Sequence, residues 1–317
     1  MIILPWRVIF FGTPSFAVPT LKGLLESPDE VIAVVTQPDR KKGRGQKVTF
    51  SPVKELVSQY RQREVLIFQP EKVREDAFQD NLRDLHPDLF IVTAYGQILP
   101  KSLLEIPKHG AINVHASLLP KYRGAAPIAW AILKGEKVTG VTIMRMDEGM
   151  DTGDIVLQKE ILIGGDETAE TLLDKLASSG ASLLLEAVAK IKHGDVSPIR
   201  QDHTQATYAP PLKKEDGRID WRREAGEIDR QVRAFNPWPG AHTSLNERFL
   251  KIFRGEVREE TAGDDAGRIL WVGTDFIEVG TGKGSFLIKE VQVEGKRKMT
   301  VRELLAGHNV PVGTRFR

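Results

Sequence analysis

The sequence predicts an α/β fold with a mostly parallel sheet, followed by a smaller all-β domain. Over roughly the first 200 residues, short apolar and β-branched runs alternate with amphipathic stretches, which is the order of βαβ units. After about residue 210 the runs become short and alternating, and glycine-rich turns separate them. At 317 residues, 41% of them hydrophobic, the chain is long enough for two such domains.

Five apolar runs in the first part are typical of strands whose two faces are both buried, as in a parallel sheet covered by helices. They are RVIFF (7–11), EVIAVVT (30–36), VLIF (65–68), DLFIVTAY (88–95) and AINVH (111–115). The segments between them are amphipathic and predict helices near 16–26, 51–62, 74–85 and 98–105. In such a fold, ligands bind outside the carboxyl ends of the strands.

A long helix is predicted to end this first domain. The remaining elements before the domain boundary are a helix, two strands and this long helix, at 125–134, 138–146, 154–163 and 166–191. Residues 194–209 are polar, contain proline and show no periodicity, which is typical of a linker. We therefore expect domains over 1–193 and 210–317, with the linker over 194–209 between them.

The second domain is expected to contain one helix and a small β-barrel. The helix is predicted at 223–235. It is followed by the short runs AHTSL, RFLKIFRGEV, GRILWVG, FIEVG and SFLIKEVQV. Their spacing and their glycine-rich turns are typical of a barrel.

Composition excludes several classes of protein and site. The chain has no cysteine, which removes disulfides, thiolate catalysis and cysteine metal sites. No run approaches the roughly 18 apolar residues of a membrane span, and the N-terminal residues do not have the pattern of a secretory signal, so we expect a cytoplasmic protein without membrane contact. The formal net charge is only +2, yet the stretch 39–54 is strongly basic, either as a solvated loop or as a surface for a polyanion.

Familiar phosphate and metal motifs do not fit. GTPSF (12–16) follows the first strand but lacks the glycines of a dinucleotide-binding loop. GTGKGS (280–285) has the wrong spacing for a Walker loop and predicts a hairpin turn. The seven histidines are scattered, so we expect no metal, and Ser117 lacks the G-x-S-x-G elbow of a nucleophilic serine.

The strongest candidate for chemistry is the end of the fifth strand. Asn113 and His115 are two residues apart, so their side chains lie on the same side of that strand. An amide can donate to a developing oxyanion and an imidazole can pass a proton, a pair that suits acyl transfer to an amine. A later loop holds carboxylates, one of which could orient the imidazole. The alternative is a structural role, which is more common for a lone histidine near a strand end. These carboxylates are Asp147, Glu148, Asp151 and Asp154.

The motifs together resemble a known family. INVHASLLP-x-x-RG (112–124) and D-x-GMDTGD (147–154) are similar to the motifs of the formyltransferases that use 10-formyltetrahydrofolate. The resemblance implies that Asn113, His115 and Asp151 are catalytic. It also implies that a turn contacts the folate and that no metal takes part. The residues of this turn are Ser117, Leu118, Leu119 and Pro120.

The resemblance extends along the chain to AYGQILP (94–100), DGRIDW (216–221) and FNPWPGA (235–241). It implies a Rossmann-like domain with helices on both faces of its sheet, a C-terminal OB-like barrel, and a member of the family that formylates the α-amino group of methionine on initiator tRNA for translation initiation. We also expect a monomer. The basic loop would bind the tRNA acceptor stem, aided by the barrel. The residues concerned in this loop are Arg40, Lys41, Lys42, Arg44 and Lys47.

Two alternatives differ from this interpretation. The first is another formyltransferase or a hydrolase on the same scaffold, acting on a glycinamide ribonucleotide, an amino sugar nucleotide or water. A basic loop and a second domain would be unnecessary for a purine-pathway enzyme. The second is a noncatalytic RNA-binding protein, which would have no use for the three polar residues and would usually show more aromatic stacking positions than the 7% aromatic content here provides.

Overall fold

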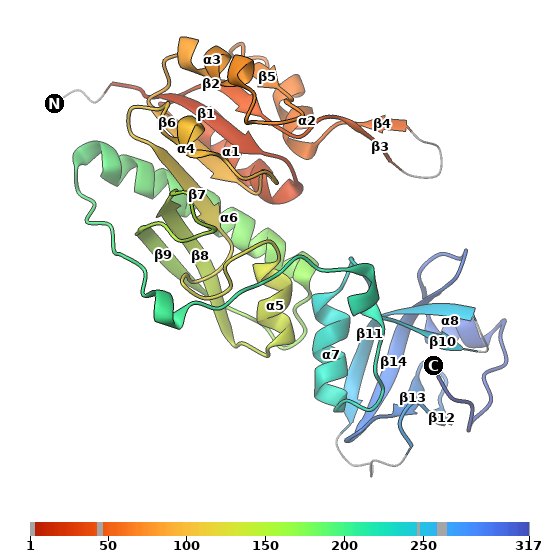
Figure 1. Ribbon diagram of the computed structural model, residues 1–317. Helices are drawn as coiled ribbons and strands as arrows, with labels where there is room; N and C mark the ends of the chain where they lie inside the picture. Colours follow the sequence, from red (N-terminus) through yellow and green to blue (C-terminus); the bar gives the residue numbers. More distant parts are fainter. Residues whose placement is uncertain (1–3, 43–46, 246–247, 259–264, 317) are drawn as a thin grey trace. The chain divides into compact units, whose positions relative to one another are not determined.

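The computed structural model describes residues 4–42, 47–245, 248–258 and 265–316. The chain forms two compact units (Figure 1). The first contains residues 1–127, 138–162 and 173–209, and the second contains 128–137, 163–172 and 210–317. The domain limits expected from the sequence stay a prediction.

The first unit is built on a seven-stranded sheet with the order β5-β2-β1-β6-β7-β8-β9. The five strands from β5 to β7 are parallel, and β8 and β9 run antiparallel to their neighbours. The strands are β1 (Arg7–Gly12), β2 (Glu30–Val35), β5 (Leu66–Phe68), β6 (Leu89–Thr93), β7 (Ala111–His115), β8 (Val138–Arg145) and β9 (Ile155–Leu162). Because parallel neighbours end at one edge, the carboxyl ends of β1, β6 and β7 meet there.

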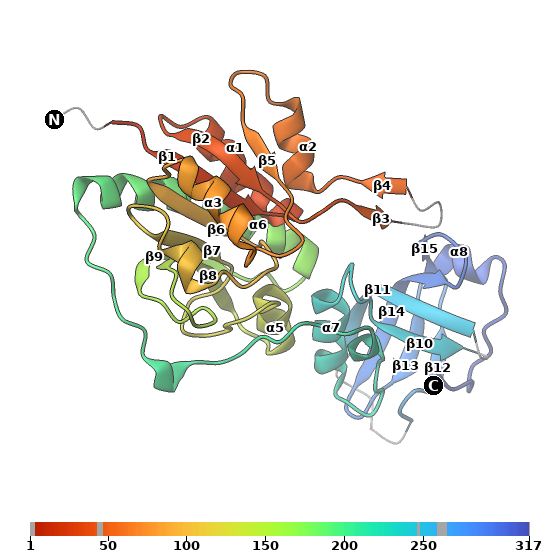
Figure 2. The ribbon, with the colours of Figure 1, turned by 45° about the horizontal axis from the view of Figure 1, so that its top comes forward.

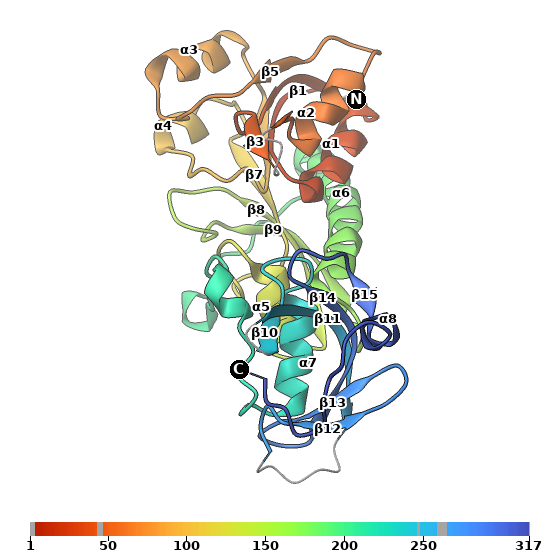
Figure 3. The same cartoon turned by 90° about the vertical axis from the view of Figure 1, so that its right-hand side faces the viewer.

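Helices cover both faces of this sheet. Alternate residues of β1, such as Ile9 and Phe11, pack in one core with α3 and α4, and α1 and α6 lie on the opposite face (Figure 3). Helix α6 packs closely against β7 at Gly180: a Cβ added there would lie only 2.9 Å from the side chain of Val114. The helices with residues in this unit are α1 (Val18–Leu25), α2 (Pro52–Gln59), α3 (Asp76–Asp84), α4 (Lys101–Leu104), α5 (Pro127–Leu133) and α6 (Ala169–His193), of which α5 and the start of α6 extend into the second unit.

The second unit contains a six-stranded antiparallel sheet and α7 (Figure 2). Four strands pair in the order β10-β11-β14-β13, with β12 beside β13 and β15 beside β14. Its elements are α7 (Ala225–Ala234), β10 (His242–Leu245), β11 (Arg248–Arg258), β12 (Ile269–Val272), β13 (Ile277–Gly280), β14 (Ser285–Val293), β15 (Met299–Thr300) and α8 (Val301–Leu305). Its core joins α7, through Ile228 and Val232, to strand residues such as Phe286 and Ile288. The expected combination of a mostly parallel, helix-covered sheet and an OB-like domain is confirmed.

One local feature follows the sequence prediction, and two others differ from it. GTGKGS forms the expected turn, with Gly284 at a φ of 77° between β13 and β14. The long helix begins at Ala169 because the N–H of Thr168 donates to Oγ1 of Thr171 and the N–H of Thr171 donates back to Oγ1 of Thr168. The basic loop contains a short hairpin that the sequence analysis did not predict, β3 (Arg40–Lys42) and β4 (Lys47–Thr49).

Candidate active site at the end of strand β7

Asn113 and His115 occupy the carboxyl end of β7, where the sequence predicts them. Val114, between them, points to the face of the sheet that α6 covers. The side chains of Asn113 and His115 therefore point to the opposite face. Asn113 is half-buried and His115 is 6% exposed. A strand between β6 and β8 is held on both sides, so these two side chains start from a rigid backbone.

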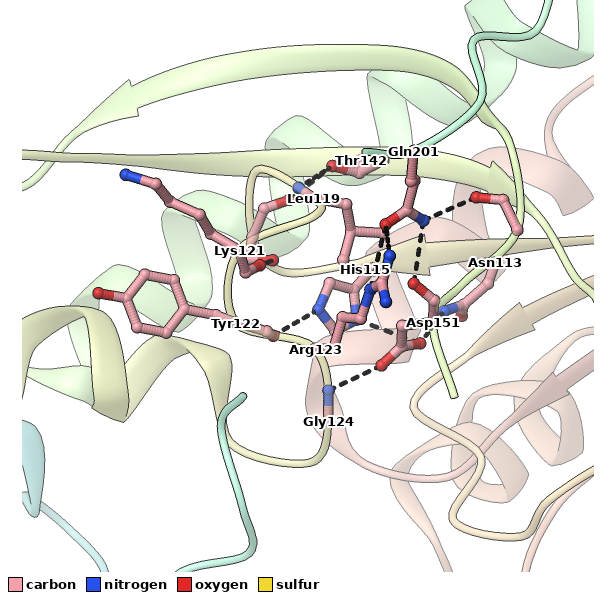
Figure 4. Close-up of polar contacts among 12 residues, drawn as sticks. Asn113, His115, Leu119, Lys121, Tyr122, Arg123, Gly124, Thr142, Asp151 and Gln201 are labelled. Atoms are coloured by element: carbon pink, nitrogen blue, oxygen red, sulfur yellow. Dashed lines mark hydrogen bonds and ion pairs between the residues drawn. The ribbon is translucent and has the colours of Figure 1, made fainter. Parts of the chain in front are cut away.

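Asp151 is the carboxylate that meets them (Figure 4). It lies in the loop between β8 and β9, with Oδ1 3.6 Å from Nδ1 of His115 and 3.5 Å from the donating Nδ2 of Asn113. Its Oδ2 accepts the backbone N–H of Gly124 at 2.8 Å. Asp147 instead accepts from Thr152 within the loop.

The backbone of Asp151 has a left-handed conformation, with a φ of 56°. A residue with a Cβ adopts this region at a cost of about 1–2 kcal/mol. The loop around it is tight, because a side chain at Gly153 would lie 1.9 Å from the carbonyl oxygen of Arg145. Strain of this kind is common at functional sites, where surrounding contacts maintain it.

The imidazole of His115 lies between two hydrogen-bond acceptors. Nε2 is 3.0 Å from the carbonyl oxygen of Tyr122, and Nδ1 faces Asp151. A neutral imidazole has one N–H and can donate to only one of these groups, whereas the imidazolium can donate to both. Because the amide of Asn113 contacts the same carboxylate oxygen, the site brings together an imidazole that can pass a proton, a carboxylate and a neutral donor.

The turn expected to contact folate packs tightly on β8 and β9. The hydroxyl of Ser117 is buried and donates to the carbonyl of Lys121 at 2.6 Å. Thr142 on β8 donates to the carbonyl of Ser117 and accepts the N–H of Leu119, while Gln158 on β9 donates to the carbonyl of Leu119. The side chain of Leu119 is buried with two others, and Leu118 and Pro120 are half-buried. Contact of this turn with folate stays a prediction.

Residues that the sequence analysis did not single out complete the site. Arg123 and Gln201 are buried and hydrogen-bonded to each other, and Gln201 donates to the backbone of Asp151 (Figure 4). Arg123 lies inside a recognised motif, but nothing in the motif marks it as buried. Gln201 lies in the stretch interpreted as a linker, where no pattern distinguishes it from exposed polar neighbours.

The predicted tRNA-binding residues lie on or beside the hairpin β3–β4. The side chain of Arg40 is exposed. Arg44 lies outside the described residues, as do the side chains of three others whose backbones belong to the hairpin. These three are Lys41, Lys42 and Lys47.

A network of side chains holds the base of this hairpin. Lys54 donates to Oδ2 of Asp39 and to Oε1 of Gln69, and Nε2 of Gln69 donates to Oδ1 of Asp39 at 2.9 Å. The hydrogen bonds from Lys54 and Gln69 hold the pKa of the Asp39 carboxyl below its ordinary value. Lys54 is therefore engaged inside the protein, although its charge contributes to the basic stretch of the sequence.

The described residues do not provide two further kinds of feature. Among them, no group of three or more histidine, aspartate or glutamate side chains is placed to hold a metal ion. No helix in these residues combines the length and the apolar character needed to cross a membrane.

Comparison with protein families matches both parts of the chain. Residues 6–188 match the family described as formyl transferase, and residues 211–309 match the family described as formyl transferase, C-terminal domain. A methionyl-tRNA formyltransferase of Geobacter sulfurreducens is 51% identical over 98% of this chain and 96% of its own. One of Caldanaerobacter subterraneus is 50% identical over 97% of this chain and 99% of its own.

Solved structures share the fold at low sequence identity. HypX from Aquifex aeolicus in complex with tetrahydrofolic acid is 18% identical, with a TM-score of 0.65 over 98% of this chain and 50% of its own. An N-formyltransferase from Helicobacter canadensis, solved with folinic acid and dTDP-3-aminofucose, is 21% identical, with a TM-score of 0.66 over 93% of this chain and 100% of its own.

Proposed function

The chain belongs to the formyl transferase family, and within it to the methionyl-tRNA formyltransferases, and on that premise we propose the reaction and the residues that carry it out. The formyl group of 10-formyltetrahydrofolate is transferred to the α-amino group of methionine on initiator tRNA, giving N-formylmethionyl-tRNA for translation initiation. The reaction takes place in the cytoplasm, on a monomeric enzyme. The observation that carries the assignment of residues is the convergence of Asn113, His115 and Asp151, with Oδ1 of Asp151 within 3.6 Å of both other side chains.

Bound 10-formyltetrahydrofolate supplies the formyl carbon, attached to a nitrogen that leaves with the electron pair of the broken bond. The amide of Asn113 donates to the formyl oxygen as negative charge develops there. His115 takes a proton from the attacking amine and returns one to the leaving nitrogen. Asp151 holds the imidazole and lies beside the positive charge that the ring acquires.

The site has groups that suit the two substrates. The half-buried side chains of Leu118 and Pro120 follow the strand that carries Asn113 and His115 and supply apolar surface for a flat pterin. We assign the folate to the turn at Ser117–Pro120. The tRNA is assigned to the hairpin β3–β4 and to basic residues of the second unit, since clustered lysine and arginine side chains bind a phosphate backbone. No metal takes part in the proposed transfer.

The test is the transfer of labelled formyl from 10-formyltetrahydrofolate to separate acceptors: methionyl initiator tRNA, methionyl elongator tRNA, glycinamide ribonucleotide and water. We expect label on the initiator tRNA. Label on a small amine, or release as formate, would contradict the assignment of the acceptor while leaving formyl transfer itself intact. A His115→Ala variant that binds tRNA but does not transfer formyl would support the role of the imidazole. Full activity of this variant would rule that role out.

A further inference from the structure

Arg123 and Gln201 form a buried pair beside the proposed catalytic residues. Arg123 is 2% exposed and Gln201 is 3% exposed. Nε and Nη2 of Arg123 donate to Oε1 of Gln201 at 3.2 and 2.6 Å, and Nη2 also lies 3.1 Å from Nδ1 of His203. A buried guanidinium is costly unless its N–H groups find acceptors, so this contact strongly fixes the amide oxygen of Gln201.

With its oxygen fixed, the amide nitrogen of Gln201 has a defined direction. Nε2 donates to the carbonyl oxygen of Asp151 at 2.9 Å and to that of Gly153 at 2.7 Å. These two carbonyls lie on either side of Thr152, in the turn where Asp151 adopts its left-handed backbone. Because the backbone conformation sets the direction of the side chain, these hydrogen bonds help to aim the Asp151 carboxylate at His115.

The segment that carries Gln201 also holds the other neighbour of the imidazole. Thr207 accepts the N–H of Tyr122 with its hydroxyl oxygen and that of Arg123 with its carbonyl oxygen, both at 2.9 Å. The N–H of Ala209 donates to the carbonyl of Arg123 at 2.7 Å. Tyr122, whose φ is 59°, is the residue whose carbonyl lies against Nε2 of His115. Residues 201–209 therefore contact both segments that face the ring nitrogens of His115: the turn of Asp151 on the Nδ1 side and the loop of Tyr122 on the Nε2 side.

We infer that Gln201, held by Arg123, is a positioning residue for formyl transfer and acts through the orientation of Asp151. The inference rests on the proposed function. Gln201 does not touch the reacting groups; it maintains the turn that places the carboxylate beside the imidazole. Misplacing a catalytic group by about 1 Å can reduce the rate about 100-fold, so the loss should appear in kcat rather than in substrate affinity.

Two substitutions of Gln201 separate positioning from folding. Gln201→Met keeps the length and removes the hydrogen bonds. Gln201→Glu gives Arg123 a charged acceptor, which should preserve the buried pair, but turns the N–H donor into an acceptor facing two carbonyls. For both variants we expect kcat to fall about 100-fold, with KM for folate and for tRNA within about twofold of wild type. Gln205→Met, an exposed glutamine of the same segment, is the matched control and should keep wild-type kcat.

The decisive measurement is a double-mutant cycle with Asp151→Asn, using single-turnover rates. If Gln201 acts through Asp151, Gln201→Glu should cost about 100-fold in the wild-type background and less than about threefold when Asp151→Asn is already present. If Gln201→Glu lowers the rate by the same factor in both backgrounds, the inference is overturned. A raised KM with unchanged kcat would overturn it as well. So would a loss of kcat that matches the loss of folded protein in circular dichroism.

A readout that does not depend on activity separates this inference from the proposed function. Oδ2 of Asp151 accepts the N–H of Gly124, so a reoriented carboxylate should release that amide. Hydrogen exchange at Gly124 should accelerate at least about tenfold in Gln201→Glu and remain at the wild-type rate in Gln205→Met; unchanged exchange in Gln201→Glu would contradict the inference. A wild-type protein that formylates no tRNA would refute the proposed function whatever the exchange result.

Discussion

Oδ1 of Asp151 lies 3.6 Å from Nδ1 of His115, while Oδ2 of the same carboxylate accepts the N–H of Gly124 at 2.8 Å. The carboxylate is thus held at one oxygen and presented to the imidazole at the other. We expect Asp151→Asn to lower kcat about 10²–10⁴-fold, because an amide of the same shape cannot balance the charge of an imidazolium. Single-turnover formyl transfer with saturating substrates measures this loss.

Binding of tRNA serves as the control for Asp151→Asn, since the substitution changes neither the hairpin nor the second unit. The dissociation constant for initiator tRNA should stay within about twofold of wild type, as expected for a loss confined to the transition state. A variant that loses affinity and keeps its single-turnover rate would show that Asp151 supports binding rather than chemistry.

Asn113 provides a second, separate prediction. Its half-buried amide lies 3.5 Å from Oδ1 of Asp151, the oxygen that also faces the imidazole, so it is placed to donate to the developing oxyanion. Removing one such donor typically costs about 10²–10³ in kcat, and we expect this from Asn113→Ala in steady-state formylation. Asn81→Ala, at an exposed position of α3, is the control. Less than a threefold loss in kcat for Asn113→Ala would argue against an oxyanion role.

The sequence predicts the part of this site that depends on the spacing of neighbouring residues in one strand. Asn113 and His115 follow from an apolar strand and a spacing of two, and both the strand and its place at the carboxyl edge are confirmed. Four nearby carboxylates are equivalent by chemistry alone, and only the family resemblance points to Asp151. The turn at Asp151 and the folding of its loop decide which carboxylate meets the ring, and neither can be read from composition.

Gln201 shows why the rest of the site escapes prediction. Its partner Arg123 is 78 residues away in sequence, and both are polar residues in stretches without periodicity. Their burial results from the way residues 201–209 lie along the loop after β7, which is a tertiary contact. For the same reason the sequence does not show which charges are free to bind a ligand: Lys54 counts as basic in the sequence but is paired with Asp39 in the fold.

The network at the base of the hairpin makes stability depend on pH. Hydrogen bonds from Lys54 and Gln69 lower the pKa of Asp39 in the folded protein, so its contribution is complete above the ordinary value near 3.8 and is lost as pH falls through the lowered pKa. Asp39→Asn should therefore reduce the free energy of unfolding by about 1 kcal/mol at neutral pH and by less in strong acid. Urea unfolding at neutral pH and near pH 3 or below measures the difference.

An exposed aspartate serves as the control for this network. Asp84 lies at the end of α3, and no hydrogen bond or ion pair of its side chain is found among the described residues. Asp84→Asn should change stability little at either pH, because its carboxyl loses no partner. A cost of Asp39→Asn that stays constant across the acid range would mean that shape, rather than the charge of Asp39, supports the hairpin.

Basic side chains of the second unit differ in how far they are available to tRNA. Arg222 is bound by Asp220 through both carboxylate oxygens, at 2.8 and 2.9 Å, whereas Arg254 and Lys296 are exposed and have no ion pair in the part of the chain that the structure describes. We expect Arg254→Gln/Lys296→Gln to weaken tRNA binding and to reduce the slope of log affinity against log salt by about 0.7–0.9 for each phosphate that the variant no longer neutralises. Arg222→Gln should change that slope far less, because the arginine's charge is already balanced. Equal effects of the double variant and of Arg222→Gln, in filter binding across a salt series, would show that local pairing does not determine which cations meet the RNA.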